Sequence, residues 1–148
     1  MIRYVISLFV FFAGFYATIL ISGDSILNLL WLPSFIAVGI IPFLFVSVLF
    51  GFKNIASAFS SAVKKETEKE KLLKAIEFFN FYGKITWIAA LIAVILGIVS
   101  ILANLEDTAM LGPNVALALI SLLYGGLINA LLILPFAFLL KKQLADRE

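Results

Sequence analysis

Small and polar side chains recur at helical spacing along two apolar stretches of the sequence, 85–105 and 108–140, and these are the residues best placed to do chemistry. They lie 4, 3, 4, 3 and 4 residues apart on the first stretch and 4, 3, 4 and 4 apart on the second. The residues are Thr86, Ala90, Ala93, Gly97, Ser100 and Asn104, then Asn114, Ala118, Ser121, Gly125 and Asn129. Such spacing keeps each set on one helix face. Either these faces let neighbouring helices pack closely, or they line a pore or bind another helix.

The residue types that most enzymes and metal sites need are missing. The 148 residues include neither cysteine nor histidine, so the usual zinc, haem and iron–sulfur sites lose their main ligands. The commonest general base is also absent. A net charge of +2 is too small for a general nucleic-acid binder. We therefore expect no enzyme, no metal site, no resident cofactor and no nucleic-acid partner.

The composition indicates an all-α integral membrane protein. Apolar residues make up 64% of the chain, charged residues only 14%, and the mean hydropathy is +1.15. Four stretches without a charged residue, of 20, 28, 21 and 33 residues, each reach the length of about 20 residues that a membrane-spanning helix needs. They are 4–23, 25–52, 85–105 and 108–140. We predict a single membrane domain over 1–148 with spans at about 3–22, 29–52, 84–104 and 113–140.

The first stretch resembles a secretory signal only superficially. Its apolar core is longer than the 7 to 15 residues typical of a signal, and no A-x-A site follows it. We expect it to be retained as a span.

The segment 53–83 is predicted to be a short cytoplasmic helical hairpin that extends the second and third spans. Apolar residues recur at helical spacing before and after a charged run, 64–71. They are Ile55, Phe59 and Val63, then Leu72, Ile76, Phe79 and Gly83. The charged run is interpreted as a solvated turn between helix ends, with a patch that binds lipid headgroups as the alternative.

The basic residues predict the orientation of the chain. All eleven lie at the two termini or in the central segment, and the connectors Ser22–Ser25 and Asn104–Asp107 contain none. By the positive-inside rule, both termini and the central segment are cytoplasmic.

The interiors of the four predicted spans therefore contain no Asp, Glu, Lys or Arg. Proteins that move protons through their own chain usually place an ionisable group there, so a titrating group, if ions are handled, is expected on a partner. Pro33, Pro42 and Pro135 are expected to interrupt backbone hydrogen bonds and bend their helices. Pro113, after Gly112, is expected in the first turn of the fourth span.

The last two spans resemble those of MotA-type stator proteins, in the MotA/TolQ/ExbB group. The likeness covers roughly 25–60 and 85–140, and it is most specific in the last span. There the chain has a Leu-x-Asn-Leu motif, an acidic loop, Gly-Pro, Ala-x-Ala-Leu, a hydroxyl, Tyr-Gly and a late proline. These are Leu102 to Leu105, Glu106 and Asp107, Gly112 and Pro113, Ala116 to Leu119, Ser121, Tyr124 with Gly125, and Pro135. Pro33-Ser34, Lys53-Asn54 and Phe59 add a looser likeness around the second span.

The resemblance implies a subunit of an ion-driven motor or channel in the bacterial inner membrane. Five copies would surround two single-span partner chains, and a partner aspartate would carry H⁺ or Na⁺. Ser121 is then the candidate for ion contact, and Pro135 shapes an inner gate. The candidates for facing the partner helices are Thr86, Ala90, Ala93, Gly97, Ser100, Ala118, Gly125 and Asn129.

The sequence also departs from the family pattern. Leu122 replaces the second hydroxyl, Trp87 replaces a proline, and Ala93-Val94 replaces a Gly-Thr pair. The large cytoplasmic domain of MotA is reduced to the segment 53–83. Two alternatives follow: a membrane scaffold of the same fold that conducts no ions, and a small four-span transporter, which the lack of an ionisable residue in the spans disfavours.

Overall fold

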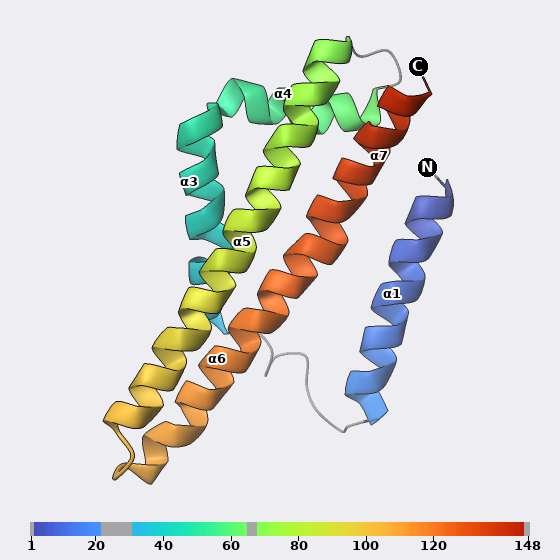
Figure 1. Cartoon of the computed structure of the whole chain (residues 1–148). Coiled ribbons are helices and arrows are strands. Elements are labelled where there is room, and N and C mark those ends of the chain that lie inside the picture. The colour runs from blue at the N-terminus through green and yellow to red at the C-terminus, as the bar shows by residue number, and fades with distance from the viewer. Residues whose placement is uncertain (1, 22–30, 65–67, 147–148) are drawn as a thin grey trace. The chain divides into compact units, whose positions relative to one another are not determined.

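The structure, a computed structural model, describes residues 2–21, 31–64 and 68–146, and all regular elements in these ranges are helical (Figure 1). The chain divides into two units, 1–32 and 33–148. The first unit contains α1 (Ile2–Ile21). The elements that follow are α2 (Leu32–Phe35), the π-helical η2 (Ile36–Ile40), α3 (Ile41–Phe50), α4 (Phe52–Val63), α5 (Lys69–Ala103), α6 (Thr108–Ile128), the π-helical η3 (Asn129–Ile133) and α7 (Leu134–Ala145).

Three helical stretches among the described residues are long and apolar enough to cross a membrane. They are Leu32–Phe50, Lys69–Ala103 and Thr108–Ala145, and they correspond to the second, third and fourth predicted spans. The predicted all-α fold is thereby confirmed for the described residues, with three of its four predicted spans matched by helices of sufficient length and hydropathy. The first predicted span coincides with α1, a helix of 20 residues without a charged residue beyond Arg3, and its crossing of the membrane stays a prediction. The predicted connector Ser22–Ser25 lies outside the described residues.

Prolines mark the two places where the helical hydrogen bonds change. Proline has no N–H and its ring crowds the carbonyl four residues earlier. Just before Pro42, the N–H of Ile41 donates to the carbonyl of Ile36, and just before Pro135, the N–H of Leu134 donates to the carbonyl of Asn129. Both bonds reach back five residues, which is the π-helical pattern.

Of the other two prolines, Pro33 lies at the start of a helix and Pro113 lies inside one. Pro33 is the second residue of α2, where a missing N–H costs no helical bond. The expected place of Pro113 in the first turn is wrong, because α6 begins at Thr108. The N-terminus of α6 is capped by the carboxylate of Asp107, which accepts a hydrogen bond of 3.0 Å from the N–H of Ala109.

The predicted hairpin differs from the structure in the direction of α4. The chain turns sharply at Gly51, whose φ is +80°, a value that favours glycine because it lacks a Cβ. As a result α4 does not continue the second span but lies across α5 and α7 (Figure 1). Of the second and third spans, the third is the one that continues into the segment 53–83, since α5 runs without a break for 35 residues.

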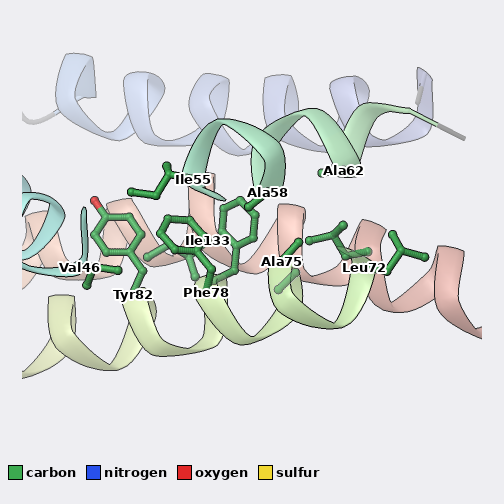
Figure 2. Close-up of a cluster of buried hydrophobic side chains, with 12 residues drawn as sticks. Val46, Ile55, Ala58, Ala62, Leu72, Ala75, Phe78, Tyr82 and Ile133 are labelled. Carbon is green, nitrogen blue, oxygen red and sulfur yellow. The ribbon is translucent and has the colours of Figure 1, made fainter. Parts of the chain in front are cut away.

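The main core of the second unit lies where α4 crosses α5 and α7 (Figure 2). Phe79 of α5 is fully buried, and its ring centroid lies 5.1 Å from that of Phe59, 5.0 Å from Phe78 and 5.4 Å from Phe136. The other buried members are Val46, Ile55, Ala58, Ala62, Leu72, Ala75, Tyr82, Ile133, Ala137 and Leu140. Val63, expected on the apolar face of α4, is exposed instead. These contacts hold α4 across α5 and α7, and we call α4 in this position the crosspiece.

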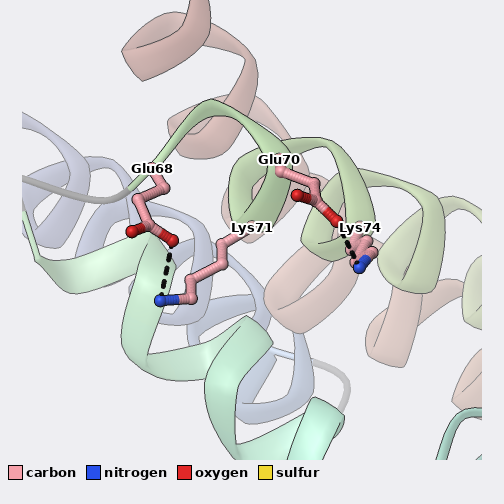
Figure 3. A network of polar contacts seen from close by, with 4 residues as sticks. All are labelled: Glu68, Glu70, Lys71 and Lys74. Carbon is pink, nitrogen blue, oxygen red and sulfur yellow. Dashed lines mark hydrogen bonds and ion pairs between the residues drawn. The ribbon is translucent and has the colours of Figure 1, made fainter.

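The charged run continues into the first turns of α5 as exposed ion pairs (Figure 3). Lys71 Nζ lies 2.9 Å from Glu68 Oε2, and Lys74 Nζ lies 2.6 Å from Glu70 Oε1. Pairs spaced three and four residues apart support a helix end modestly. Residues 65–67 of the run lie outside the described part of the chain.

Candidate functional site

The two faces of small and polar residues meet each other inside the chain. We call this contact between α5 and α6 the seam. Its buried members are Thr86, Ala90, Ala93 and Gly97 of α5, and Asn114, Ala118, Ser121, Gly125 and Asn129 of α6 and η3. Ser100 is only half-buried and Asn104 is exposed, so the α5 face leaves the seam at its last turn.

Gly125 and Gly97 in the seam, and Gly83 next to it, keep the helices too close together for a further side chain. A methyl group on Gly125 would lie 2.7 Å from Ala90 Cβ. A methyl group on Gly97 would lie 2.9 Å from Ala118 Cβ, and one on Gly83 would lie 2.9 Å from Asn129 Oδ1. The geometry is that of close helix packing. In this arrangement the candidate residues contact one another, and contact with a partner helix stays a prediction.

The polar side chains of the seam bind their own helices. Thr86 Oγ1 donates to the carbonyl of Tyr82 at 2.9 Å, and Asn129 Nδ2 donates to the carbonyl of Gly125 at the same distance. Buried polar groups need such partners, because an unsatisfied one costs free energy. Asn114 Nδ2 is buried without a hydrogen-bond partner among the described residues.

Ser121, the candidate for ion contact, belongs to a cluster of oxygen atoms that joins α2 to α6. Its hydroxyl lies 3.0 Å from Ser34 Oγ and 2.7 Å from the carbonyl oxygen of Leu117. Ser34 Oγ lies 3.4 Å from the same carbonyl. Both serines are fully buried. The hydroxyl of Ser121 therefore points into the chain, and ion contact requires this cluster to open.

The sequence contained no signal for the pairing of Ser34 with Ser121. The two residues are 87 positions apart, and Ser34 contributes to the family likeness only as part of the Pro33-Ser34 pair. A hydroxyl just after a first-turn proline is the one local hint. This local feature does not identify which residue of another helix would contact Ser34.

The serine pair should show energetic coupling. We expect Ser121→Ala to lower the free energy of unfolding by about 1 kcal/mol, because it removes a hydroxyl that two buried oxygens share. In a double-mutant cycle with Ser34→Ala, we expect a coupling energy of about 0.5–1 kcal/mol. The measurement is unfolding in mild detergent.

Ser47→Ala is the matched control for this cycle. Ser47 is also fully buried, but its hydroxyl donates within its own helix, to the carbonyl of Phe43 at 2.6 Å. Its coupling to Ser121→Ala should be close to zero. Equal coupling for Ser34 and Ser47 would contradict the cluster.

Pro135, the gate candidate, is the second residue of α7, and α7 directly follows η3. It is half-buried. The geometry explains the change in helical hydrogen bonding, whereas a gating role stays a prediction.

Comparison with known proteins places these elements in one family. The MotA/TolQ/ExbB proton channel family matches residues 52–148, which comprise α4 to α7. The uncharacterized protein YtxD of Bacillus subtilis strain 168 is 35% identical over 75 residues, which are 51% of this chain and 28% of the relative. Chemotaxis protein PomA of Vibrio alginolyticus is 27% identical over 84 residues, 55% of this chain and 33% of the relative. Motility protein A of Aquifex aeolicus is 34% identical over 79 residues, 53% of this chain and 28% of the relative.

The aligned region spans about a third or less of the length of these relatives. The family match itself covers well over half of the chain and includes the whole seam on α5, α6 and η3. The expected family likeness is confirmed, and the chain belongs to the MotA/TolQ/ExbB proton channel family.

Proposed function

We propose that the chain is the membrane subunit of an ion-driven motor or channel complex. Five copies would surround a dimer of a single-span partner, and a partner carboxylate would bind H⁺ or Na⁺. The observation that carries this proposal is the family match over α4 to α7. The lack of any Asp, Glu, Lys or Arg in the four charge-free stretches supports it, because the ionisable group must then come from another chain.

Within this proposal the seam has a mechanical role. The glycines let α5 and α6 approach closely, and we infer that the two helices move as one pair. A partner helix would reach the predicted partner-facing residues of the seam only if the seam opened. While the seam is closed, the partner would act on the outer faces of this pair, and the seam residues would set the shape of those faces. Ser121 would meet the ion only in a state in which its contact with Ser34 is broken.

The proposed site of action is the bacterial inner membrane, in contact with its lipid. The distribution of basic residues favours both termini and the segment 53–83 on the cytoplasmic side. The names of the relatives, a chemotaxis protein and a motility protein, support motility as the load, which we include in the proposal.

Native mass spectrometry tests the assembly. The complex is purified in mild detergent together with the product of any neighbouring gene that encodes a single-span protein. We expect five copies of this chain with two partner chains, and a partner aspartate just inside its apolar stretch. A monomer or dimer without a partner would contradict the proposal. Ion uptake into vesicles, with that aspartate changed to asparagine as the control, then tests conduction.

A second function is favoured by two specific observations. The hydroxyl of Ser121 is buried against Ser34, and Leu122 occupies the position where the family resemblance has a second hydroxyl. Both facts fit a scaffold that holds its partner without ion flow. The scaffold predicts that collapsing the ion gradient leaves the activity of the partner unchanged, whereas the motor predicts its loss.

A further inference from the structure

Aromatic contacts place α3, α5 and α7 side by side. Their outward faces can therefore be compared at the same height, that is, at the same position along the helix axes. On one side of α5, the ring centroid of Tyr82 lies 6.0 Å from that of Phe43 in α3. On another side, Phe79 stacks on Phe136 of α7 at 5.4 Å. The ring centroid of Phe50, at the end of α3, lies 5.6 Å from that of Phe78. The stretch 77–84 of α5 is therefore level with α3 and with the first half of α7.

At this height α3 and α7 expose only apolar side chains. Val48 of α3 is 79% exposed, and Leu134 and Phe138 of α7 are 62% and 67% exposed. No charged residue occurs in the sequence between 25 and 52, and none occurs in α7 before Lys141. Large apolar side chains on a membrane protein favour lipid or another apolar surface.

The outward face of α5 is polar at the same height. Glu77, Asn80 and Lys84 are all exposed, and their spacing of three and four residues places them on one helix face. We call them the polar stripe. Lys84 alone could extend its ammonium group along the helix toward headgroups. Glu77 and Asn80 are too short to do so, and a carboxylate facing hydrocarbon is strongly unfavourable.

We propose that the polar stripe lines a water-filled vestibule that enters the membrane from the end of the bundle that carries α4. The apolar faces of α3 and α7 at the same height stay in apolar surroundings. Water on one side of the helix group and apolar contact on the other satisfy both sets of side chains. A single copy cannot enclose such water, so the proposal rests on the assembly of several copies described above.

The vestibule would shorten the apolar route of an ion. The charge-free stretch that includes most of α6, η3 and α7 is 33 residues long. The charge-free stretch on α5 is shorter, because it begins only at residue 85 and has 21 residues. Glu77 and Lys84 are seven residues apart, so the vestibule would be about 10 Å deep. Lys84 is its innermost charge, and an ion leaving the apolar stretch would meet water at that point.

Cysteine labelling tests this asymmetry in the assembled protein, because the natural chain contains no cysteine. Single variants Glu77→Cys, Asn80→Cys, Leu134→Cys and Phe138→Cys are placed in membrane vesicles of both orientations. A charged methanethiosulfonate reagent that does not cross membranes is added, and labelling after denaturation gives the total. Lys74→Cys serves as the accessible control. Ile95→Cys, in the middle of the charge-free stretch, serves as the inaccessible control.

We expect Glu77→Cys and Asn80→Cys to react about tenfold faster than Leu134→Cys and Phe138→Cys, since a thiol in apolar surroundings stays protonated and inert. Fast labelling at all four positions would overturn the vestibule, because the membrane surface would then lie at the height of Lys84. Slow labelling at all four would also overturn it, because the stripe would be covered. Labelling requires no ion flux, so asymmetric labelling without flux would refute conduction and leave the vestibule intact.

Discussion

A Phe79→Ala variant is expected to lose about 3–5 kcal/mol of unfolding free energy, the largest effect of any single substitution proposed for this chain. Phe79 is fully buried and packs against rings from three helices: Phe59 of α4, Phe78 of its own helix and Phe136 of α7. Removing its ring would leave a cavity that these rings can fill only in part. Thermal unfolding in mild detergent measures the loss, and protease sensitivity of α4 reports whether the crosspiece detaches.

Phe138→Ala is the matched control for this change. Phe138 is a phenylalanine of α7 with most of its surface exposed, so its removal should cost about 0.5 kcal/mol or less. Similar losses for Phe79→Ala and Phe138→Ala would show that the cluster does not hold α4 in place.

Adding one methyl group at Gly125 is the second large effect. Gly125→Ala would place a Cβ 2.7 Å from Ala90 Cβ, which is closer than two carbon atoms can approach. The helices must separate or shift, and we expect a loss of about 1–3 kcal/mol of unfolding free energy. In the complex we expect a matching loss of copurifying partner, because the outer faces of the pair would change shape.

Two variants make this prediction specific. Gly126→Ala adds the same methyl group one residue later, where it would meet only the Trp87 ring, at 3.9 Å, and it should be close to neutral. Ala90→Gly combined with Gly125→Ala moves the methyl from α5 to α6 and should restore most of the stability. Failure of this rescue would mean that Gly125 is needed for a reason other than its contact with Ala90.

The sequence predicts well those features that burial and charge decide locally. Lys84 ends the polar part of α5, and Asp107 caps α6 close to where the charge-free stretch begins. The spacing of small residues identified which faces are buried, with Ser100 and Asn104 as the exceptions. It could not decide what buries them, because close packing within one chain and contact with a partner helix require the same small residues.

Features that depend on distant or single-residue geometry could not be predicted. The direction of α4 depends on the positive φ of Gly51, which glycine permits but does not enforce. The pairing of Ser34 with Ser121 joins helices far apart in the chain. Pro42 and Pro135 predicted interrupted hydrogen bonds, but a kink, a break and a π-helical turn are all compatible with proline.

The π-helical segment η2 also sets how many residues the second span can contain. Four of the buried residues around it, each four positions from the next, are Ser34, Val38, Pro42 and Val46. In a regular α-helix, each step of four residues drifts by about 40° around the axis, so three steps would drift by about 120°. The wider turn absorbs most of this drift and keeps all four residues on the inner side.

Deleting one residue within Ile36–Ile40 would allow regular helical turns, but it would rotate Ser34 by about 100° away from Ser121. Most surface loops accept insertions and deletions. This segment, by contrast, should accept only substitutions that preserve its residue count.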